Sequence, residues 1–278
     1  SGYYSLRANS SGHYNAAYGH MSLRHNTTAS NNTGIGFQSL YDATTGSNNT
    51  ASGYRSAFNI TTGTHNVSMG FRSMYCGTTA CQNVALGSMT LCNNTGSNNT
   101  AVGHSSQKHN TSGICNTALG NFSLCASTTA NYNVALGSQV MCNNTTGGSN
   151  TGVGFKALMS NTTGACNTAV GYAAGLAATN GLLTAVGYKA LTSATAATYS
   201  TAVGLEALCA QTTAVSNTAI GWVAGSSITT GSCNNIIGTD AGRSITTGGG
   251  NIALGNRALQ ETTTASDNTA IGKSALCA

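Results

Sequence analysis

The stretch NTAVG occupies residues 99–103 and recurs unchanged at residues 167–171. Close variants stand at 32–36 (NTGIG), 116–120 (NTALG), 217–221 (NTAIG) and 268–272 (NTAIG). A binding loop is needed once or twice in a chain, whereas a building element is needed many times. The stretch is therefore interpreted as a unit of architecture.

The glycine that closes this motif marks a repeat along the whole chain. From Gly2 to Gly272 the interval between successive copies is seventeen positions fourteen times and sixteen positions twice, which gives seventeen copies. No segment escapes the pattern, so we expect a single repeat domain over residues 1–278 without separate caps. Positions are counted from this glycine, which is position 0.

The columns of the repeat predict the fold. Positions −1 and +4 are apolar in most copies, and we expect these two columns to form the core. Position 0 is always glycine, as expected where the backbone needs a positive φ or has no room for a Cβ. The unit is too short for two helices and a turn, and Thr and Val beside glycine favour short strands. The sequence predicts an all-β parallel β-solenoid (β-roll or β-helix) of about seventeen 17-residue coils, stacked at about 4.8 Å.

Asparagine at position −4 supports stacking. It is present in fourteen of the sixteen complete copies, and Leu183 and Ser200 are the exceptions. In-register asparagines can donate and accept hydrogen bonds up a column, and the alternative is that each one caps a turn. The predicted ladder consists of Asn15, Asn32, Asn49, Asn66, Asn83, Asn99, Asn116, Asn133, Asn150, Asn167, Asn217, Asn234, Asn251 and Asn268.

Composition excludes several classes of partner. Charged residues make up 5% of the chain, proline is absent and the formal net charge is +5. No block of Lys or Arg exists, so nucleic acid is not an expected partner. No apolar run approaches the roughly 18–20 residues that span a bilayer, so no membrane span is expected. The chain has no initiator Met and no signal-like start, which is typical of a processed or partial product.

The NTAVG and NTAIG stretches resemble the repeated motif of trimeric autotransporter adhesin heads, which form left-handed parallel β-rolls. They are also similar to repeats of bacteriophage tail-fibre shafts. The resemblance covers the whole chain, although the long period and the ten cysteines depart from the usual pattern. It implies an extracellular, elongated protein that binds or supports, without catalysis.

The cysteines gather at particular repeat positions. Position +5 holds Cys92, Cys125, Cys142, Cys209 and Cys277, and position +12 holds Cys115, Cys166 and Cys233. Pairing the two positions between adjacent copies predicts Cys92–Cys115, Cys142–Cys166 and Cys209–Cys233, with Cys76–Cys81 inside one copy. A metal site is the alternative, but no CxxC or Cys/His cluster exists. Disulfides persist in oxidising compartments, so the pattern indicates an extracellular or cell-surface location. Cys125 and Cys277 are left over.

Thirteen N-x-[ST] sequons point the same way. They predict N-glycosylation at Asn9, Asn26, Asn31, Asn48, Asn59, Asn93, Asn98, Asn110, Asn143, Asn144 and Asn161, and more weakly at Asn66 and Asn121, which lie on the expected strand. Most lie at positions +6, +7 or the end of the variable stretch, where we expect an exposed loop. Chance occurrence in a chain rich in Ser and Thr is the alternative.

No catalytic, cofactor or metal site is expected. The five carboxylates form no plausible acid–base pair, and the six histidines, all before residue 110, are interpreted as surface residues rather than metal ligands. Position +1 carries an aromatic stripe of Tyr3, Phe37, Tyr54, Phe71, Phe155, Tyr172, Tyr188 and Trp222. This stripe either binds sugars or a neighbouring copy, or packs at the corner of each coil.

The sequence therefore favours a structural subunit of an extracellular, N-glycosylated, disulfide-stapled fibre that assembles end to end with copies of itself. Uncapped coils offer unpaired strand edges for such stacking. The alternative is a rod-like adhesin or tail-fibre shaft, a trimer in that case, which binds surface carbohydrate. A third alternative is ice binding through ranks of Thr at positions −3, +8 and +9. An enzyme is not expected.

Overall fold

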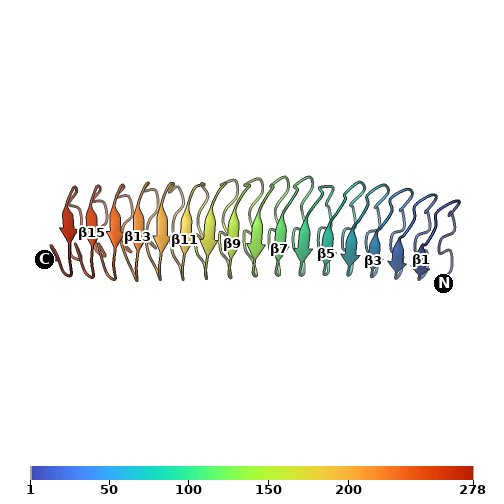
Figure 1. Cartoon of the computed structure of the whole chain (residues 1–278), viewed down its shortest axis with the longest axis horizontal. Helices are drawn as coiled ribbons and strands as arrows, with labels where there is room; N and C mark the ends of the chain where they lie inside the picture. The colour runs from blue at the N-terminus through green and yellow to red at the C-terminus, as the bar shows by residue number, and fades with distance from the viewer. Residues whose placement is uncertain (1, 278) are drawn as a thin grey trace. The chain divides into compact units, whose positions relative to one another are not determined.

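The computed structural model describes residues 2–277, which form two compact units, unit 1 (Ser1–Gln139) and unit 2 (Val140–Ala278). The single repeat domain predicted over residues 1–278 stays a prediction, and its terminal residues Ser1 and Ala278 lie outside the described part of the chain. Each unit is a stack of coils (Figure 1).

Every strand has three residues and covers positions −3 to −1 of one copy. Unit 1 contains β1 (Ala16–Tyr18), β2 (Thr33–Ile35), β3 (Thr50–Ser52), β4 (Val67–Met69), β5 (Val84–Leu86), β6 (Thr100–Val102), β7 (Thr117–Leu119) and β8 (Val134–Leu136). Unit 2 contains β9 (Thr151–Val153), β10 (Thr168–Val170), β11 (Thr184–Val186), β12 (Thr201–Val203), β13 (Thr218–Ile220), β14 (Asn235–Ile237), β15 (Ile252–Leu254) and β16 (Thr269–Ile271). The described residues thus hold sixteen strands for seventeen repeat glycines, because the first copy begins at its glycine, Gly2. No helix occurs between residues 2 and 277.

Within each unit the strands pair in parallel and in sequence order. The register joins identical repeat positions: Thr100 lies opposite Thr117, and Ala101 opposite Ala118. Figure 1 shows these strands running the same way, each followed by the loop that leads to the next coil. The prediction of an all-β parallel β-solenoid with a 17-residue repeat is confirmed.

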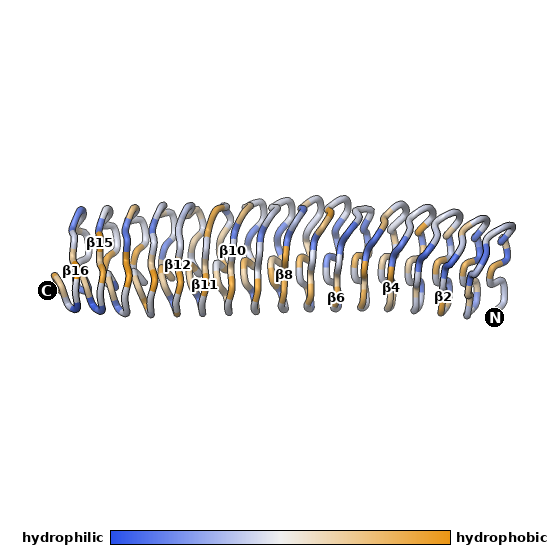
Figure 2. Tube along the Cα trace, viewed as in Figure 1, coloured by the Kyte–Doolittle hydropathy of each residue, from blue (hydrophilic) through white to orange (hydrophobic). Residues whose placement is uncertain are grey.

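The strands place position −2 in the core and position −1 outside. Ala51, Ala118 and Ala219 at position −2 are fully buried, whereas Ile35 and Met69 at position −1 are 45% and 46% exposed. Successive side chains of a strand point to opposite faces, and the inward side chain is small in most copies, with the buried Ile236 of β14 as the exception. The prediction that position −1 belongs to the core is therefore wrong, although Figure 2 shows apolar residues recurring on the strands.

The prediction that position +4 belongs to the core is confirmed in the inner coils. Leu40, Leu91, Leu158 and Leu208 are at most 1% exposed. Leu276 is 57% exposed, because no further coil lies over it among the described residues. Leucine at +4 therefore fills the space that the small residue at −2 leaves.

Glycine at position 0 meets both expected requirements. At Gly53 φ is +133°, a conformation that residues with a side chain rarely adopt. A Cβ there would also lie 2.6 Å from the carbonyl oxygen of Gly70 in the next coil. The corner is therefore closed to every other residue type.

Three further positions complete the turn of a coil in left-handed backbone conformation, and most copies hold residues other than glycine there. In one copy these are Gln38 at +2 (φ 53°), Leu40 at +4 (φ 51°) and Asn48 at +12 (φ 61°). Positive φ is uncommon outside glycine, and here each N–H donates to a carbonyl of an adjacent coil, for example Leu40 N to Ser56 O at 3.0 Å. Hydrogen bonds between coils therefore hold conformations that a single coil would not keep.

Candidate functional site

The inward asparagines at position −4 bind one another from coil to coil. The backbone N–H of Asn49 donates to Oδ1 of Asn32 (2.8 Å), and that of Asn66 to Oδ1 of Asn49 (3.0 Å). The Nδ2 group of Asn32 donates to the carbonyl of Gly46 (2.8 Å). These side chains are buried, so their amides join coils and are inaccessible to a ligand.

The ladder continues across one of its two gaps through a substitute side chain. Where Ser200 replaces asparagine, Nε2 of Gln211 donates to its Oγ (2.8 Å). The Oε1 atom of Gln211 accepts from Nδ2 of Asn217 (3.0 Å). A longer amide at position +7 thus satisfies the groups that the missing asparagine would have bound.

A second column of buried asparagines lies at position +7, and it corrects the expectation that sequons of this column are exposed. Nδ2 of Asn110 donates to Oδ1 of Asn94 (2.7 Å) and to the carbonyl of Gly113 (2.9 Å). The same inward placement holds for the sequons of this column in the inner coils, and the −4 ladder buries one more; the buried sequons are Asn26, Asn66, Asn110, Asn144 and Asn161. The expectation of an exposed loop is therefore wrong at the four +7 positions among them, and glycosylation at all five stays a prediction.

The remaining sequon asparagines are accessible. Asn9, Asn31, Asn48, Asn93, Asn98, Asn121 and Asn143 are exposed, and Asn59 is half-buried. Asn31, Asn48 and Asn98 each stand five residues before the next repeat glycine, where the backbone is left-handed and the side chain is exposed. Glycosylation at these eight positions stays a prediction.

The cysteines of the predicted staples lie in different columns. The free thiols include both members of three predicted pairs and one member of the fourth: Cys92, Cys115, Cys209, Cys233, Cys76, Cys81 and Cys166. Stacking brings together residues of the same column, and buried positions +7 and +10 separate +5 from +12 along the coil. Spacing along the chain therefore does not bring these sulfurs together in the structure, and the four disulfides stay predictions.

Two thiols at position +5, those of Cys92 and Cys209, have raised pKa values. Burial raises the pKa of Cys92, and the nearby Cys76 raises it further, whereas Lys108 and Arg72 lower it. Burial also raises the pKa of Cys209, with Glu206 acting in the same direction. The backbone places Cys76 beside Cys92 on adjacent coils, since Cys76 N donates to Cys92 O at 2.8 Å.

The aromatic stripe at position +1 forms ladders on the outside of the coils. In unit 1, Tyr54 lies between Phe37 and Phe71, with ring centroids 5.3 and 5.4 Å apart and planes within 11°. In unit 2, Tyr172 and Tyr188 stack at 5.1 Å. Tyr54 remains 41% exposed. The rings therefore stack along the coil column with their edges in solvent, rather than packing into the corner of their own coil.

A second aromatic ladder, which the sequence analysis missed, runs along position +5 of unit 1. Tyr41 and Phe58 stack at 4.8 Å, and Phe58 and Tyr75 at 5.2 Å. Cations at position +2 lie between the ladders: the guanidinium of Arg55 is 5.4 Å from the Phe58 ring. The recurrence of aromatics at one repeat position is the signal that could have found it.

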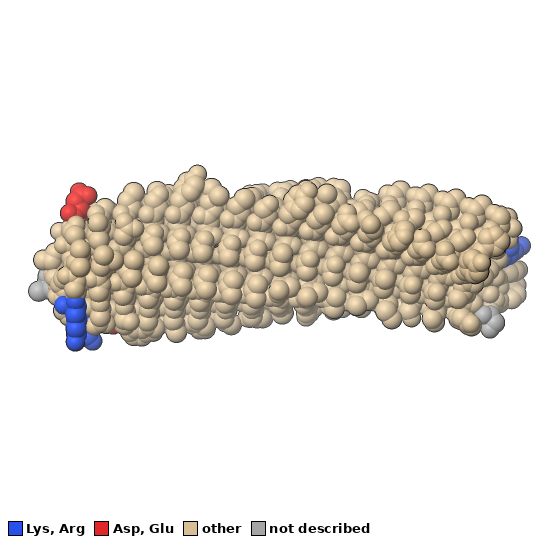
Figure 3. All heavy atoms as spheres, in the orientation of Figure 1, with Lys and Arg blue, Asp and Glu red and all other residues tan. Residues whose placement is uncertain are grey.

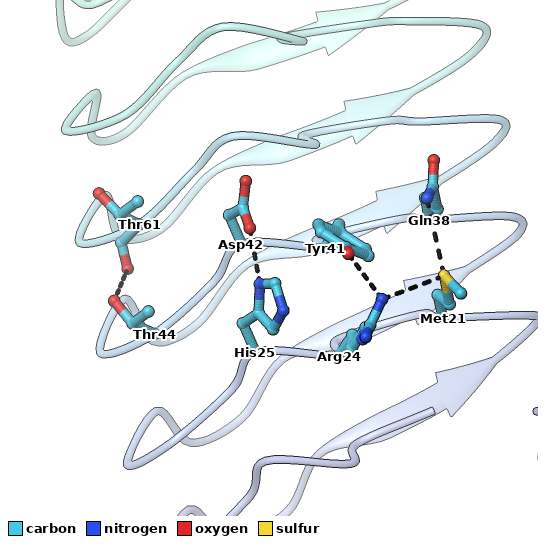
Figure 4. Close-up of polar contacts among 8 residues, drawn as sticks. All are labelled: Met21, Arg24, His25, Gln38, Tyr41, Asp42, Thr44 and Thr61. Carbon is cyan, nitrogen blue, oxygen red and sulfur yellow. Dashed lines mark hydrogen bonds and ion pairs between the residues drawn. The ribbon is translucent and has the colours of Figure 1, made fainter. Parts of the chain in front are cut away.

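Polar side-chain contacts join neighbouring coils near the start of unit 1 (Figure 4). Nη1 of Arg24 donates to the hydroxyl of Tyr41 (2.8 Å), and Nδ1 of His25 contacts Oδ1 of Asp42 (2.8 Å). Both side chains reach toward the next coil (Figure 4). Arg7, Ala8, Arg24 and His25 line a cavity of about 220 Å³.

Threonines at position +8 use their hydroxyls within the solenoid. Oγ1 of Thr44 donates to the carbonyl of Thr61 (3.1 Å; Figure 4), and that of Thr229 to Thr246 (3.2 Å). A hydroxyl that donates to a carbonyl has no donor left for an external lattice. This rank is therefore less suited to ice than its sequence indicates.

The outer face of the strands is uncharged, and it carries an apolar rank at position −1 beside a rank at position −3 that is threonine in ten of the sixteen complete copies. Positions −3 and −1 hold no Asp, Glu, Lys or Arg in any complete copy. Large side chains exposed on it are Tyr18, Ile35, Met69, Leu119, Val134, Val170, Ile220, Ile237 and Ile271. The face of the molecule drawn in Figure 3 likewise carries few charged atoms.

Comparisons with protein-family models, curated proteins and solved structures found no match. Among residues 2–277 no helix is long and apolar enough to cross a membrane. The same residues contain no group of three or more His, Cys, Asp or Glu side chains that could hold a metal ion. The site residues are therefore interpreted from their own geometry.

Proposed function

We propose that this chain is a structural segment of an extracellular fibre, and that it associates with copies of itself through the outer strand face. The single observation that carries the proposal is the exposed apolar rank at position −1. In unit 1 it includes Ile35 and Met69, and in unit 2 Ile220 at 40% exposure. Adjacent members follow one another at about the strand spacing of 4.8 Å.

Burial of this rank would be favourable. Each Å² of apolar surface removed from water contributes roughly 25 cal/mol, and soluble monomers rarely expose contiguous apolar patches larger than a few hundred Å². Positions −3 and −1 hold no charge in any complete copy, so no like-charge repulsion opposes contact between two such faces. Association through this face requires no assumption about the ends of the chain.

The polar groups inside the coils favour a structural role of the chain over a catalytic one. Amide and hydroxyl groups inside the coils, such as those of Asn32 and Ser39, bind neighbouring coils. The eight accessible sequons and the cysteines at positions +5 and +12 fit a protein exposed to an oxidising environment. Extracellular location and glycosylation are parts of the same proposal.

A second candidate is a rod-like adhesin or tail-fibre shaft, which the resemblance of the repeat implies. The observation that favours it is the pair of aromatic ladders with cations between them, such as Arg55 beside Phe58. Trimerisation in this case would use the same apolar face. The two candidates differ in whether the surface also binds a target.

Electron microscopy of the purified chain tests the first candidate. The proposal expects elongated assemblies whose number rises with protein concentration. Glycosidase treatment followed by mass measurement tests the surface at the same time, because glycans are expected only at accessible sequons such as Asn48 and Asn98. Isolated single particles at every concentration would contradict the proposed assembly.

A further inference from the structure

The two units have the same number of Lys and Arg residues but different numbers of carboxylates. Unit 1 has five Lys or Arg residues and one carboxylate, Asp42, which gives a formal charge of +4. Unit 2 has five cations and four carboxylates, a formal charge of +1. The one carboxylate of unit 1 is already paired with His25 at 2.8 Å. Unit 1 therefore carries a nearly uncompensated set of cations.

These cations occupy two columns that run side by side. Arg55 and Arg72 lie at position +2, and Arg7, Arg24 and Lys108 at position +5. We call these five residues the cationic stripe. From Arg7 to Lys108 it covers six coil steps, about 29 Å at 4.8 Å per step. Arg72 and Lys108 both act on the thiol of Cys92, which places the two columns close together.

Aromatic rings hold the arginines in place. The guanidinium of Arg72 lies 5.4 Å from the rings of both Phe71 and Tyr75, and the guanidinium of Arg55 lies 5.3 Å from Tyr54. Such contacts orient a guanidinium without using its N–H donors. Arg55 commits Nε to Gln38 (2.7 Å), so its Nη groups remain for a ligand.

We propose that the cationic stripe of unit 1 binds an acidic polysaccharide, one whose sulfate or carboxylate groups meet successive arginines. The cavity of about 220 Å³ between Arg7, Ala8, Arg24 and His25 receives one such group. Guanidinium groups pair with sulfate and carboxylate oxygens through two parallel hydrogen bonds. The site extends to both sides of the aromatic ladders, whose exposed edges contact the sugar rings.

The arrangement of the rings favours a saccharide over a single-stranded nucleic acid. Proteins that bind single-stranded nucleic acids offer free aromatic faces on which the bases stack. Here Tyr54 has Phe37 on one face and Phe71 on the other, so an intruding base would have to separate a formed ladder. The acidic groups of a polysaccharide need only the guanidinium donors, which they reach without opening the ladder. The inference does not depend on self-association of the chain.

Titration calorimetry with a heparin fragment long enough to span the stripe tests the proposal, using the whole chain. The test variant is Arg24→Gln with Arg72→Gln. The matched control is Arg243→Gln with Arg257→Gln, which removes the same charge from the same columns, +5 and +2, of unit 2. Circular dichroism melting of both variants checks that each remains folded.

We expect the Kd of the test variant to rise about a hundredfold, about tenfold for each charge-assisted hydrogen-bonded pair that is removed, and that of the control to change less than about twofold. Desulfated fragment should bind the wild type correspondingly more weakly. Equal losses in both variants would indicate non-specific charge attraction and overturn the proposal. Failure of the wild type to bind would overturn it too, as would equally tight binding of single-stranded oligothymidine.

Discussion

The two units fill the same coil with different chemistry. In unit 1, position +3 is mostly serine, and Oγ of Ser106 donates to the carbonyl of Ala118 (3.0 Å). In unit 2 the same position is mostly alanine, such as the buried Ala207. Position +7 varies within each unit instead: unit 1 holds the hydrogen-bonded Asn110 and the buried Ile60, and unit 2 holds the hydrogen-bonded Asn161 and the buried Ile228.

Comparison of the interiors distinguishes the features that every coil needs from the side chains that can vary. Backbone pairing and the glycine corner are common to both units, for instance at Gly120 and Gly204. The interior accepts a polar side chain where each buried donor finds an acceptor, and an apolar one where the volume fits. Three substitution experiments and one alkylation experiment can break or sharpen this comparison.

The largest effect is expected at the corner, and it should be equal in the two units. Gly120→Ala and Gly204→Ala each introduce a Cβ at a φ near +140°, against the carbonyl of the next coil. Each should lower the free energy of unfolding by about 3 kcal/mol, measured by urea unfolding. A cost in only one unit would show that the two coils are not equivalent.

The next effect distinguishes the fillings of position +7. Ile228→Ala should cost about 3 kcal/mol because it leaves a cavity in unit 2. Asn110→Ala should cost about 2 kcal/mol because it removes two buried hydrogen bonds, to Oδ1 of Asn94 and to the carbonyl of Gly113, of about 1 kcal/mol each. The same urea titrations measure both, and a neutral Asn110→Ala would refute a structural role for the second asparagine column.

A smaller effect is expected at position +3. Ser106→Ala converts this position to the residue that unit 2 uses, and it should cost about 1 kcal/mol or less. Hydrogen exchange at the amides of β6 and β7 would report the change locally. A loss as large as that of Gly120→Ala would contradict interchangeability of the two interiors.

The smallest effect concerns the thiols, where the two units should agree. Raised pKa values leave Cys92 and Cys209 with less thiolate at pH 8 than ordinary thiols have. They should therefore react with iodoacetamide about threefold more slowly than the exposed Cys115 and Cys233. Mapping of alkylated peptides without reductant measures these rates. Complete protection of all four would instead support the predicted disulfides.

The sequence predicts the period and the corner because backbone geometry imposes them on every copy. A glycine repeated at one position indicates a corner with positive φ, and an asparagine repeated at one position indicates a hydrogen-bonded ladder. The contact between Asn32 and Asn49 is part of that ladder. The apolar character of a strand residue did not predict whether its side chain points into the interior or toward solvent. Leu and Ile at position −1 are the most apolar residues of the strand, yet the narrow interior takes the alanine beside them.

The exposure of the glycosylation motif could not be predicted for a related reason. The pattern Asn-x-Thr/Ser is both an acceptor for glycans and the sequence of an inward asparagine at position +7 with Thr or Ser at position +9. Asn110 and Asn161 therefore look like exposed acceptors in sequence and are buried in the structure. In the inner coils the position of the asparagine within the coil separates buried sequons, at +7, from exposed ones such as Asn48 at +12.

Sedimentation velocity over a concentration series tests the central claim, that the outer strand face is a contact surface. The test variant carries Ile35→Lys, Met69→Lys and Val102→Lys at position −1. The control carries Thr28→Lys, Thr45→Lys and Thr62→Lys at the exposed position +9. We predict that the wild type and the control associate as concentration rises and that the test variant stays monomeric. A wild type that remains monomeric throughout, or a control that dissociates as fully as the test variant, would contradict the account.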